Sequence, residues 1–126
     1  MAITLAYRFE LRASHDANET QRLASEPSTL YSGTTGLLEG GGRIVRLAGG
    51  ETLALSLGDV TNVRALMIVP ERDCILRQVV GDTGERIAAG KIYFCEFSVT
   101  SPPTAIRLTN GDAANTNDVR IVLVGT

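Results

Sequence analysis

Hydrophobic and polar residues alternate along much of this chain, and the alternation is clearest near its two ends. Between Ile3 and Leu11 every second residue is apolar, with polar or small residues between them. Val119, Ile121 and Leu123 repeat the pattern near the C-terminus. Successive side chains of a strand point to opposite faces, so both segments predict strands with one apolar and one wet face.

Turn residues divide the rest of the chain into further short strands. Gly49-Gly50 stands between two strand patterns and predicts a hairpin, because both positions tolerate positive φ. Residues 63–69 form a continuous apolar run that ends at Pro70, which predicts a strand covered on both faces. The glycine-rich segment 33–42 predicts turns. With the strands at both ends of the chain, the expected strands besides 63–69 cover about residues 2–13, 43–47, 52–57, 74–80, 91–99, 104–109 and 118–125.

About eight strands with turns between most of them predict an all-β fold. We expect one antiparallel β-sandwich domain over residues 1–126, jelly-roll-like, since 126 residues bury a core without metals or disulfides. Residues 14–31 are polar and contain Pro27, so we expect a long polar loop or arm there, or a short helix with a weak edge strand. Long loops often contact partners.

Charge and cysteine content narrow the classes of function. The net charge is −2 and no basic run occurs, which argues against a nucleic-acid or membrane-surface protein. We expect no signal peptide, because the first residues have neither a basic segment nor an apolar segment of the required kind. We expect no membrane span, because no apolar run approaches the length of one. Lys91 is the only lysine beside eleven arginines, which reflects codon bias or an interface preference for arginine. Cys74 and Cys95 are expected as buried small hydrophobes; a disulfide between neighbouring strands stays open.

Catalytic motifs are weak throughout the chain. His15 is the only histidine, and it stands in a polar segment with no nucleophile motif elsewhere, so we interpret it as a solvated loop residue. Gly40–Gly42 and Gly90-Lys91 lack the spacing of a phosphate-binding loop and suit flexible turns. We therefore expect no catalytic residue and no cofactor.

A cluster of oxygen-bearing side chains lies near the C-terminus. Asp112, Asn115, Asn117 and Asp118 fall within seven residues, and such side chains can bind Ca²⁺. Their spacing does not match an EF-hand loop, and Asn, Asp and Gly are the ordinary residues of a long turn. We favour the turn over a metal site.

Several segments of the second half resemble small β-structured virion proteins of tailed bacteriophages. Gly90 precedes the aromatic-containing segment 91–94, residues 106–110 read Ile-Arg-Leu-Thr-Asn, a Gly/Ala/Asn loop follows, and 119–125 form a last strand that ends in glycine. With residues 65–73, the resemblance covers about residues 50–126. It implies a β-sandwich, often jelly-roll-like, that decorates a capsid or belongs to a tail or neck. It carries no catalytic residues to transfer.

The leading hypothesis is a non-enzymatic phage virion protein, most simply a capsid decoration or auxiliary protein. We expect it to be located in the virion assembled in the host cytoplasm and to bind the major capsid protein or other virion proteins. We also expect a homo-oligomer, with a trimer favoured, that binds no nucleic acid, membrane or metal. The expected assembly contacts come from the adaptable segments before residue 44: Arg22, Leu23, Leu30, Tyr31, Leu37, Leu38 and Arg43.

Three alternatives stay open. The chain could be a tail or neck component of the same fold. It could be a carbohydrate- or receptor-binding module, which requires Tyr7, Tyr31 or Tyr93 on the surface. It could also be a small enzyme of the metal-barrel type with a site made of Asp and Glu, although a single histidine argues against the usual metal barrels.

Overall fold

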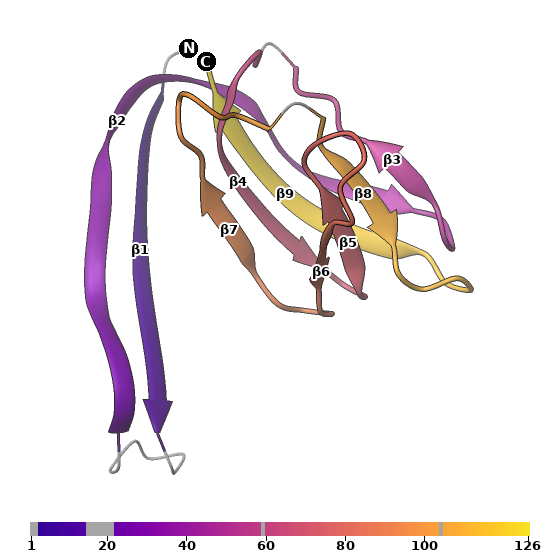
Figure 1. Cartoon of the computed structure of the whole chain (residues 1–126), viewed down its shortest axis with the longest axis horizontal. Helices are drawn as coiled ribbons and strands as arrows, with labels where there is room; N and C mark the ends of the chain where they lie inside the picture. Colours follow the sequence, from indigo (N-terminus) through magenta and orange to yellow (C-terminus); the bar gives the residue numbers. More distant parts are fainter. Residues whose placement is uncertain (1–2, 15–21, 59, 104) are drawn as a thin grey trace. The chain divides into compact units, whose positions relative to one another are not determined.

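All regular structure in the described part of this chain is β-strand (Figure 1). The computed structural model describes the backbone of residues 3–14, 22–58, 60–103 and 105–126, and within these ranges the side chains from Arg43 onward. No helix long and apolar enough to cross a membrane occurs among these residues. The predicted all-β antiparallel sandwich is confirmed, and the described residues form nine strands where about eight were expected.

The strands are short except for the first two, the fourth and the last. Their bounds are β1 (Ile3–Ser14), β2 (Arg22–Leu47), β3 (Thr52–Ala54), β4 (Val63–Pro70), β5 (Cys74–Arg77), β6 (Glu85–Ile87), β7 (Tyr93–Glu96), β8 (Arg107–Asn110) and β9 (Asn117–Gly125). Four expected strands, at 52–57, 74–80, 91–99 and 104–109, are shorter than predicted, and the sequence pattern did not predict β6.

The chain divides into two compact units, of which the first is Ala2–Leu37. It contains β1 and the first part of β2, paired antiparallel with Tyr7 opposite Tyr31. The predicted loop at 14–31 is wrong from Arg22 onward, since these residues are strand. Pro27 was one reason for predicting a loop. It lies where the pairing of β1 with β2 shifts in register, and proline is tolerated in a sheet at such an irregularity. Residues 15–21, with His15, lie outside the described residues.

Strand β2 also passes through the glycine-rich segment that predicted turns. Residues 33–42 are strand, and the pairing shifts between Glu39 and Gly41 instead of reversing the chain. Glycine in a strand often marks a bulge of this kind. The single-domain prediction for residues 1–126 stays a prediction.

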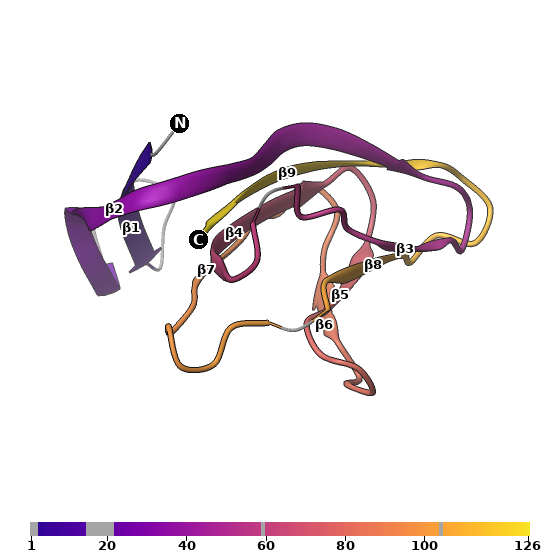
Figure 2. The same cartoon turned by 90° about the horizontal axis from the view of Figure 1, so that it is seen from above.

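The second unit, Leu38–Thr126, is the sandwich. From Leu38 onward β2 pairs with β9, and the sheet continues in the order β2-β9-β4-β7, while the other sheet has the order β3-β8-β5-β6. Figure 2 shows β9 and β4 in one layer and β8, β5 and β6 in the other. The pairing is nested from the outside inward: β2 pairs with β9, β3 with β8, β4 with β7 and β5 with β6.

The turn at Gly49-Gly50 exists, but it does not close a hairpin. Gly50 has a φ of 68°, and the amide of Glu51 donates to the carbonyl of Ala48 at 3.1 Å. The turn leads from β2 in one sheet to β3 in the other, so the hairpin prediction is wrong. Gly49 allows a close approach, because a Cβ there would meet the carbonyl oxygen of Ala113 at 2.5 Å. Turn chemistry fixes the reversal but not the strand partner.

The core fills the space between the two sheets. Alternate residues of β4, β5, β8 and β9 point into it, and every residue of β4 is buried or half-buried. The largest side chains with almost no exposure are Leu47, Leu66, Ile68, Leu76, Leu108, Ile121 and Leu123. Aliphatic packing of this kind supplies the main stabilisation of a sandwich without tryptophan.

Candidate functional site

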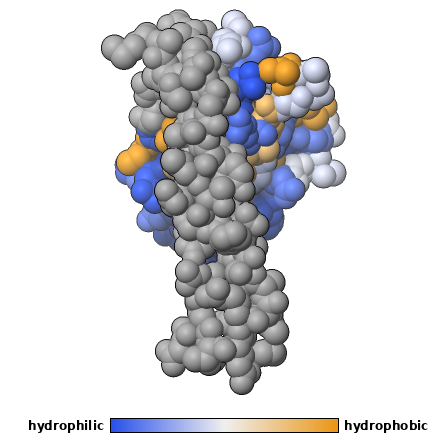
Figure 3. Space-filling view, turned by 90° about the vertical axis from the view of Figure 1, so that its left-hand side faces the viewer, coloured by the Kyte–Doolittle hydropathy of each residue, from blue (hydrophilic) through white to orange (hydrophobic). Residues whose placement is uncertain are grey.

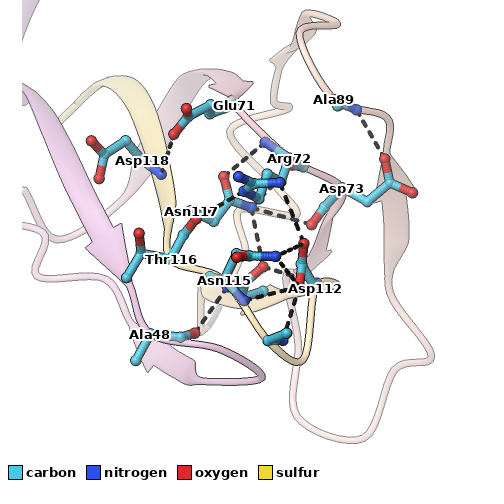
Figure 4. A network of polar contacts seen from close by, with 12 residues as sticks. Ala48, Glu71, Arg72, Asp73, Ala89, Asp112, Asn115, Thr116, Asn117 and Asp118 are labelled. Carbon is cyan, nitrogen blue, oxygen red and sulfur yellow. Dashed lines mark hydrogen bonds and ion pairs between the residues drawn. The ribbon is translucent and has the colours of Figure 1, made fainter.

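A network of polar contacts occupies one end of the sandwich, where four connections meet (Figure 4). We call it the loop-end network, made of Arg72, Asp73, Asn110, Asp112, Asn115 and Asn117. Its members come from the turn after β4, the end of β8, the loop after β8 and the start of β9. The network holds most of the residues for which the sequence suggested a cation site.

Asn117 is the most deeply buried polar residue of the network, with no exposed surface. Its Oδ1 accepts the backbone amide of Arg72 at 2.9 Å, and its Nδ2 donates to the carbonyls of Arg72 and Asp73 at 3.0 and 3.2 Å. These bonds fasten the first residue of β9 to the turn between β4 and β5. A buried amide that meets its backbone partners in this way is structural, and it has little capacity left for a ligand.

Asn110, at the end of β8, acts in the same manner and is 3% exposed. Its Nδ2 donates to the carbonyls of Ala48 and Asn115 at 2.9 and 2.7 Å, and its Oδ1 accepts the amide of Asp112 at 2.9 Å. Nδ2 of Asn117 also lies 3.4 Å from Oδ1 of Asn110. The two buried asparagines together tie three separate connections to each other.

Asp112 caps the loop between β8 and β9. Its Oδ1 accepts the amides of Ala114 and Asn115 at 2.8 and 3.0 Å, and the side chain of Asn115 adds bonds at 3.1 and 3.3 Å. The amide of Ala114 and then the contacts of Asn115 lower the pKa of Asp112. The interpretation of this segment as turn chemistry is therefore confirmed for Asp112.

Asp118 does not join the other three candidates. Its carboxylate forms a bidentate pair with Arg46 at 2.7 and 3.0 Å, and the hydrogen bond from Arg46 lowers the pKa of Asp118. The four oxygen-bearing residues therefore do not converge on one point: Asp112 and Asn115 bond to each other, Asn117 bonds to the backbone of Arg72 and Asp73, and Asp118 pairs with Arg46. Within the described ranges, no group of three or more His, Cys, Asp or Glu residues could hold a metal ion.

A shallow, open depression of about 520 Å³ lies beside the network. It is lined by Glu71, Arg72, Asp73, Ala89, Gly111, Asp112 and Ala113. The carboxylate of Asp73 accepts the amide of Ala89 at 3.0 Å and lies 3.6 Å from a guanidinium nitrogen of Arg86. The carboxylates of Asp73 and Asp112 therefore both hold backbone amides of loops that border the depression.

The outer face of the β2-β9-β4-β7 sheet carries a different set of residues. The register places Gly42, Val122, Met67 and Phe94 opposite one another across four strands. We call this line of residues the outer row. Val122 is 42% exposed and Phe94 38% exposed, while Met67 is half-buried.

A second line of the same face lies next to the outer row. Ile44 is opposite Arg120, and Arg120 is opposite Val69. Ile44 is 65% exposed. On the coloured part of the face in Figure 3, hydrophilic residues predominate and hydrophobic ones are scattered among them. On the β2-β9-β4-β7 face, apolar residues occupy consecutive cross-strand positions.

The predicted assembly residues can be placed only in part. The backbone of six of them belongs to β2, but the side chains lie outside the described part of the chain: Arg22, Leu23, Leu30, Tyr31, Leu37 and Leu38. Arg43 is described, and its Nη2 donates to the carbonyl of Ser56 at 2.7 Å. That contact ties β2 to the segment after β3.

The tyrosine and cysteine predictions have separate outcomes. Tyr93 is half-buried and its hydroxyl accepts Nε2 of Gln78 at 2.7 Å, while the side chains of Tyr7 and Tyr31 lie outside the described residues. Cys74 and Cys95 are both free, in different sheets. Cys74 is buried, as predicted, and burial raises the pKa of its thiol to about 11. Cys95 is only half-buried.

The sequence prediction did not include the outer row, although the chain contains a signal for it. Ile121, Val122, Leu123 and Val124 are consecutive apolar residues in a strand that alternates before them. Such a break in the alternation indicates an apolar residue on the wet face. In comparisons with family models, curated proteins and solved structures, nothing matches this chain.

Proposed function

We propose that this chain is a non-enzymatic virion structural protein of a tailed bacteriophage, of the capsid decoration or auxiliary type. It binds the shell and its own copies. The observation that carries the proposal is the outer row, with Val122 and Phe94 exposed beside half-buried Met67. Contiguous exposed apolar residues on a protein surface indicate an interaction site.

The nested strand pairing gives a second line of support. Each strand from the start of the sandwich pairs with one from its end, from β2 with β9 on the outside to β5 with β6 on the inside. A long antiparallel ribbon wound onto two sheets gives this order. We infer from it the jelly-roll-like winding, which is frequent in viral capsid domains and also in lectins. The fold alone does not decide between these functions.

The size of the outer face limits what it can do alone. Four strands about 4.8 Å apart and about five residues long present roughly 300 Å². A stable interface needs about 800 Å² from each partner. The outer face therefore supplies less than half of such an interface, and another part of the chain must contribute.

The unit Ala2–Leu37 is our candidate for that contribution. By itself it has two paired strands, and a two-stranded ribbon is only marginally stable in water unless further structure packs on it. Its strands also offer backbone groups on which another chain can add a strand. Three of the expected assembly residues, Arg22, Leu30 and Leu37, belong to this unit.

A charge placed in the outer row tests the proposal. Val122→Glu should lower the oligomer mass of the full chain in multi-angle light scattering. It should also weaken co-sedimentation, at least tenfold, with shells assembled from the major capsid protein of the same virion. Val80→Glu is the matched control, since Val80 is 82% exposed in the loop after β5, away from the outer row. A wild-type chain that is strictly monomeric and binds no shell would contradict the proposal.

A further inference from the structure

The outer face of the second sheet, β3-β8-β5-β6, carries several arginine and threonine residues beside Ile75. In β5 and β8 the inward positions are buried, so the intervening residues lie on the outer face. These include Arg77 opposite Arg107, and Thr109 opposite both Ile75 and Thr52. Two cations therefore face outward from directly opposed positions of neighbouring strands.

Like charges in this arrangement repel each other. Side chains directly opposite on antiparallel strands have Cβ atoms about 5 Å apart, and like charges there are destabilising. Other arginines have carboxylate partners: Arg46 pairs with Asp118, Arg72 with Asp112 and Arg86 with Asp73.

Within the described residues no carboxylate pairs with Arg77 or Arg107. Asp82 is in the loop after β5, but its Oδ2 accepts the amides of Gln78 and Val79 at 2.9 and 3.3 Å. Oδ2 of Asp82 holds the loop, its Oδ1 is buried without a hydrogen-bond partner, and no ion pair from this carboxylate offsets the repulsion between Arg77 and Arg107.

The hydrogen-bonding capacity of the two guanidiniums is also largely unused. Arg77 Nη1 donates to Oγ1 of Thr109 at 2.8 Å, and Arg107 Nη2 donates to the carbonyl of Val79 at 3.2 Å. Nε of Arg107 is buried without an acceptor. Each guanidinium has five N–H donors, so most of them are left for solvent or a ligand.

We propose that Arg77 and Arg107 form a binding site for an oxyanion, either a carboxylate or a phosphate. Arginine forks match both groups with paired N–H donors, and an anion between two guanidiniums removes their repulsion. Thr109 contributes by orienting Arg77 through the 2.8 Å bond, and its hydroxyl is held in turn by Thr52 at 2.8 Å. This site is separate from the outer row, and the proposal does not rest on the virion assignment.

Titration of the full chain followed by ¹⁵N–¹H NMR of the arginine side chains tests the site. Three probes are used separately: inorganic phosphate, citrate and a short polyglutamate peptide. We expect saturable shifts at Arg77 and Arg107. The double variant Arg77→Gln/Arg107→Gln should weaken binding at least tenfold, since glutamine retains part of the stem and loses the charge. The melting temperature should rise with the anion in the wild type only.

A matched variant separates a local site from a general effect of charge. Arg120→Gln removes an exposed arginine from the other sheet and should leave anion binding unchanged. Saturable binding of phosphate or citrate that only the double variant loses supports a site for a free anion. Binding of the peptide alone, lost in the same variant, supports the same site for acidic side chains of a partner. Non-saturable shifts with all three probes, or an equal loss in Arg120→Gln, overturn the proposal.

Discussion

The loop-end network and the outer row reverse the usual placement of polar and apolar residues. In the network, Asn110 and Asn117 are polar and almost completely buried. In the outer row, Val122 and Phe94 are apolar and exposed. A buried polar group and a contiguous exposed apolar patch are the informative exceptions in a protein, because polar residues are mostly exposed and large apolar patches are mostly buried.

The difference shows what each region contributes. The buried asparagines bond to backbone groups of distant segments, so the structure of the sandwich itself accounts for them. Val122 is 42% exposed, and the inward position next to it is filled by Leu123. The network therefore serves the fold, and we propose that the outer row serves a contact with another chain.

Neighbouring residues of β9 provide the sharpest test of this contrast. Leu123 is 1% exposed and lies opposite Leu66 in the core. Leu123→Ala should lower the free energy of unfolding by about 3 kcal/mol, through lost burial and the cavity left behind. Val122→Ala should change it by about 0.5 kcal/mol or less, because Val122 is on the outer face. Urea unfolding of both variants measures the difference.

The same pair of variants contains its own control. Both substitutions shorten an aliphatic side chain to alanine at adjacent positions of one strand, and the two side chains point to opposite faces of the sheet. Equal losses of stability in the two variants would mean that Val122 is part of a covered core. The outer row would then no longer be a surface for assembly.

Much of the fold could be predicted from the sequence, because strand periodicity is a local property. The alternation in residues 3–11 and at 119–123 predicted β1 and β9, and the apolar run 63–69 predicted β4. Strand partners are not local. Gly49-Gly50 predicted a reversal correctly, but its chemistry could not show that the chain would cross to the other sheet.

The candidate sites were less predictable for the same reason. Asn117 belongs to a segment with the composition of a solvated loop, and its partner Arg72 is 45 residues away in the chain. Only the folded arrangement shows that the amide is buried. Arg77 and Arg107 look like ordinary surface arginines in the sequence, because their opposition depends on the register between β5 and β8.

The structural role of the network predicts a second, smaller effect on stability. Asn117→Ala should lower the free energy of unfolding by about 2 kcal/mol, because the amide of Arg72 and two carbonyls lose a buried partner. Asn115→Ala should cost less than about 1 kcal/mol, since its side chain bonds only to the exposed part of Asp112. Thermal and urea unfolding measure both. An Asn117→Ala variant as stable as the Asn115→Ala variant would remove the distinction between the network and an ordinary loop.

The smallest expected effect concerns the ion pair at the border between the two regions. Arg46 lowers the pKa of Asp118, so the ionised carboxylate stabilises the folded chain above the ordinary aspartate value of about 3.9. That contribution is lost as the pH falls through the lowered pKa of Asp118. Arg46→Ala should raise this pKa toward its ordinary value and weaken the dependence of stability on pH in this acidic range. NMR titration of the carboxyl carbons measures it, with Asp112 as internal control because the amide of Ala114 is the first cause of its lowered pKa. An unchanged pKa for Asp118, or an equal rise for Asp112, would show that the Arg46 pair is not what stabilises this charge.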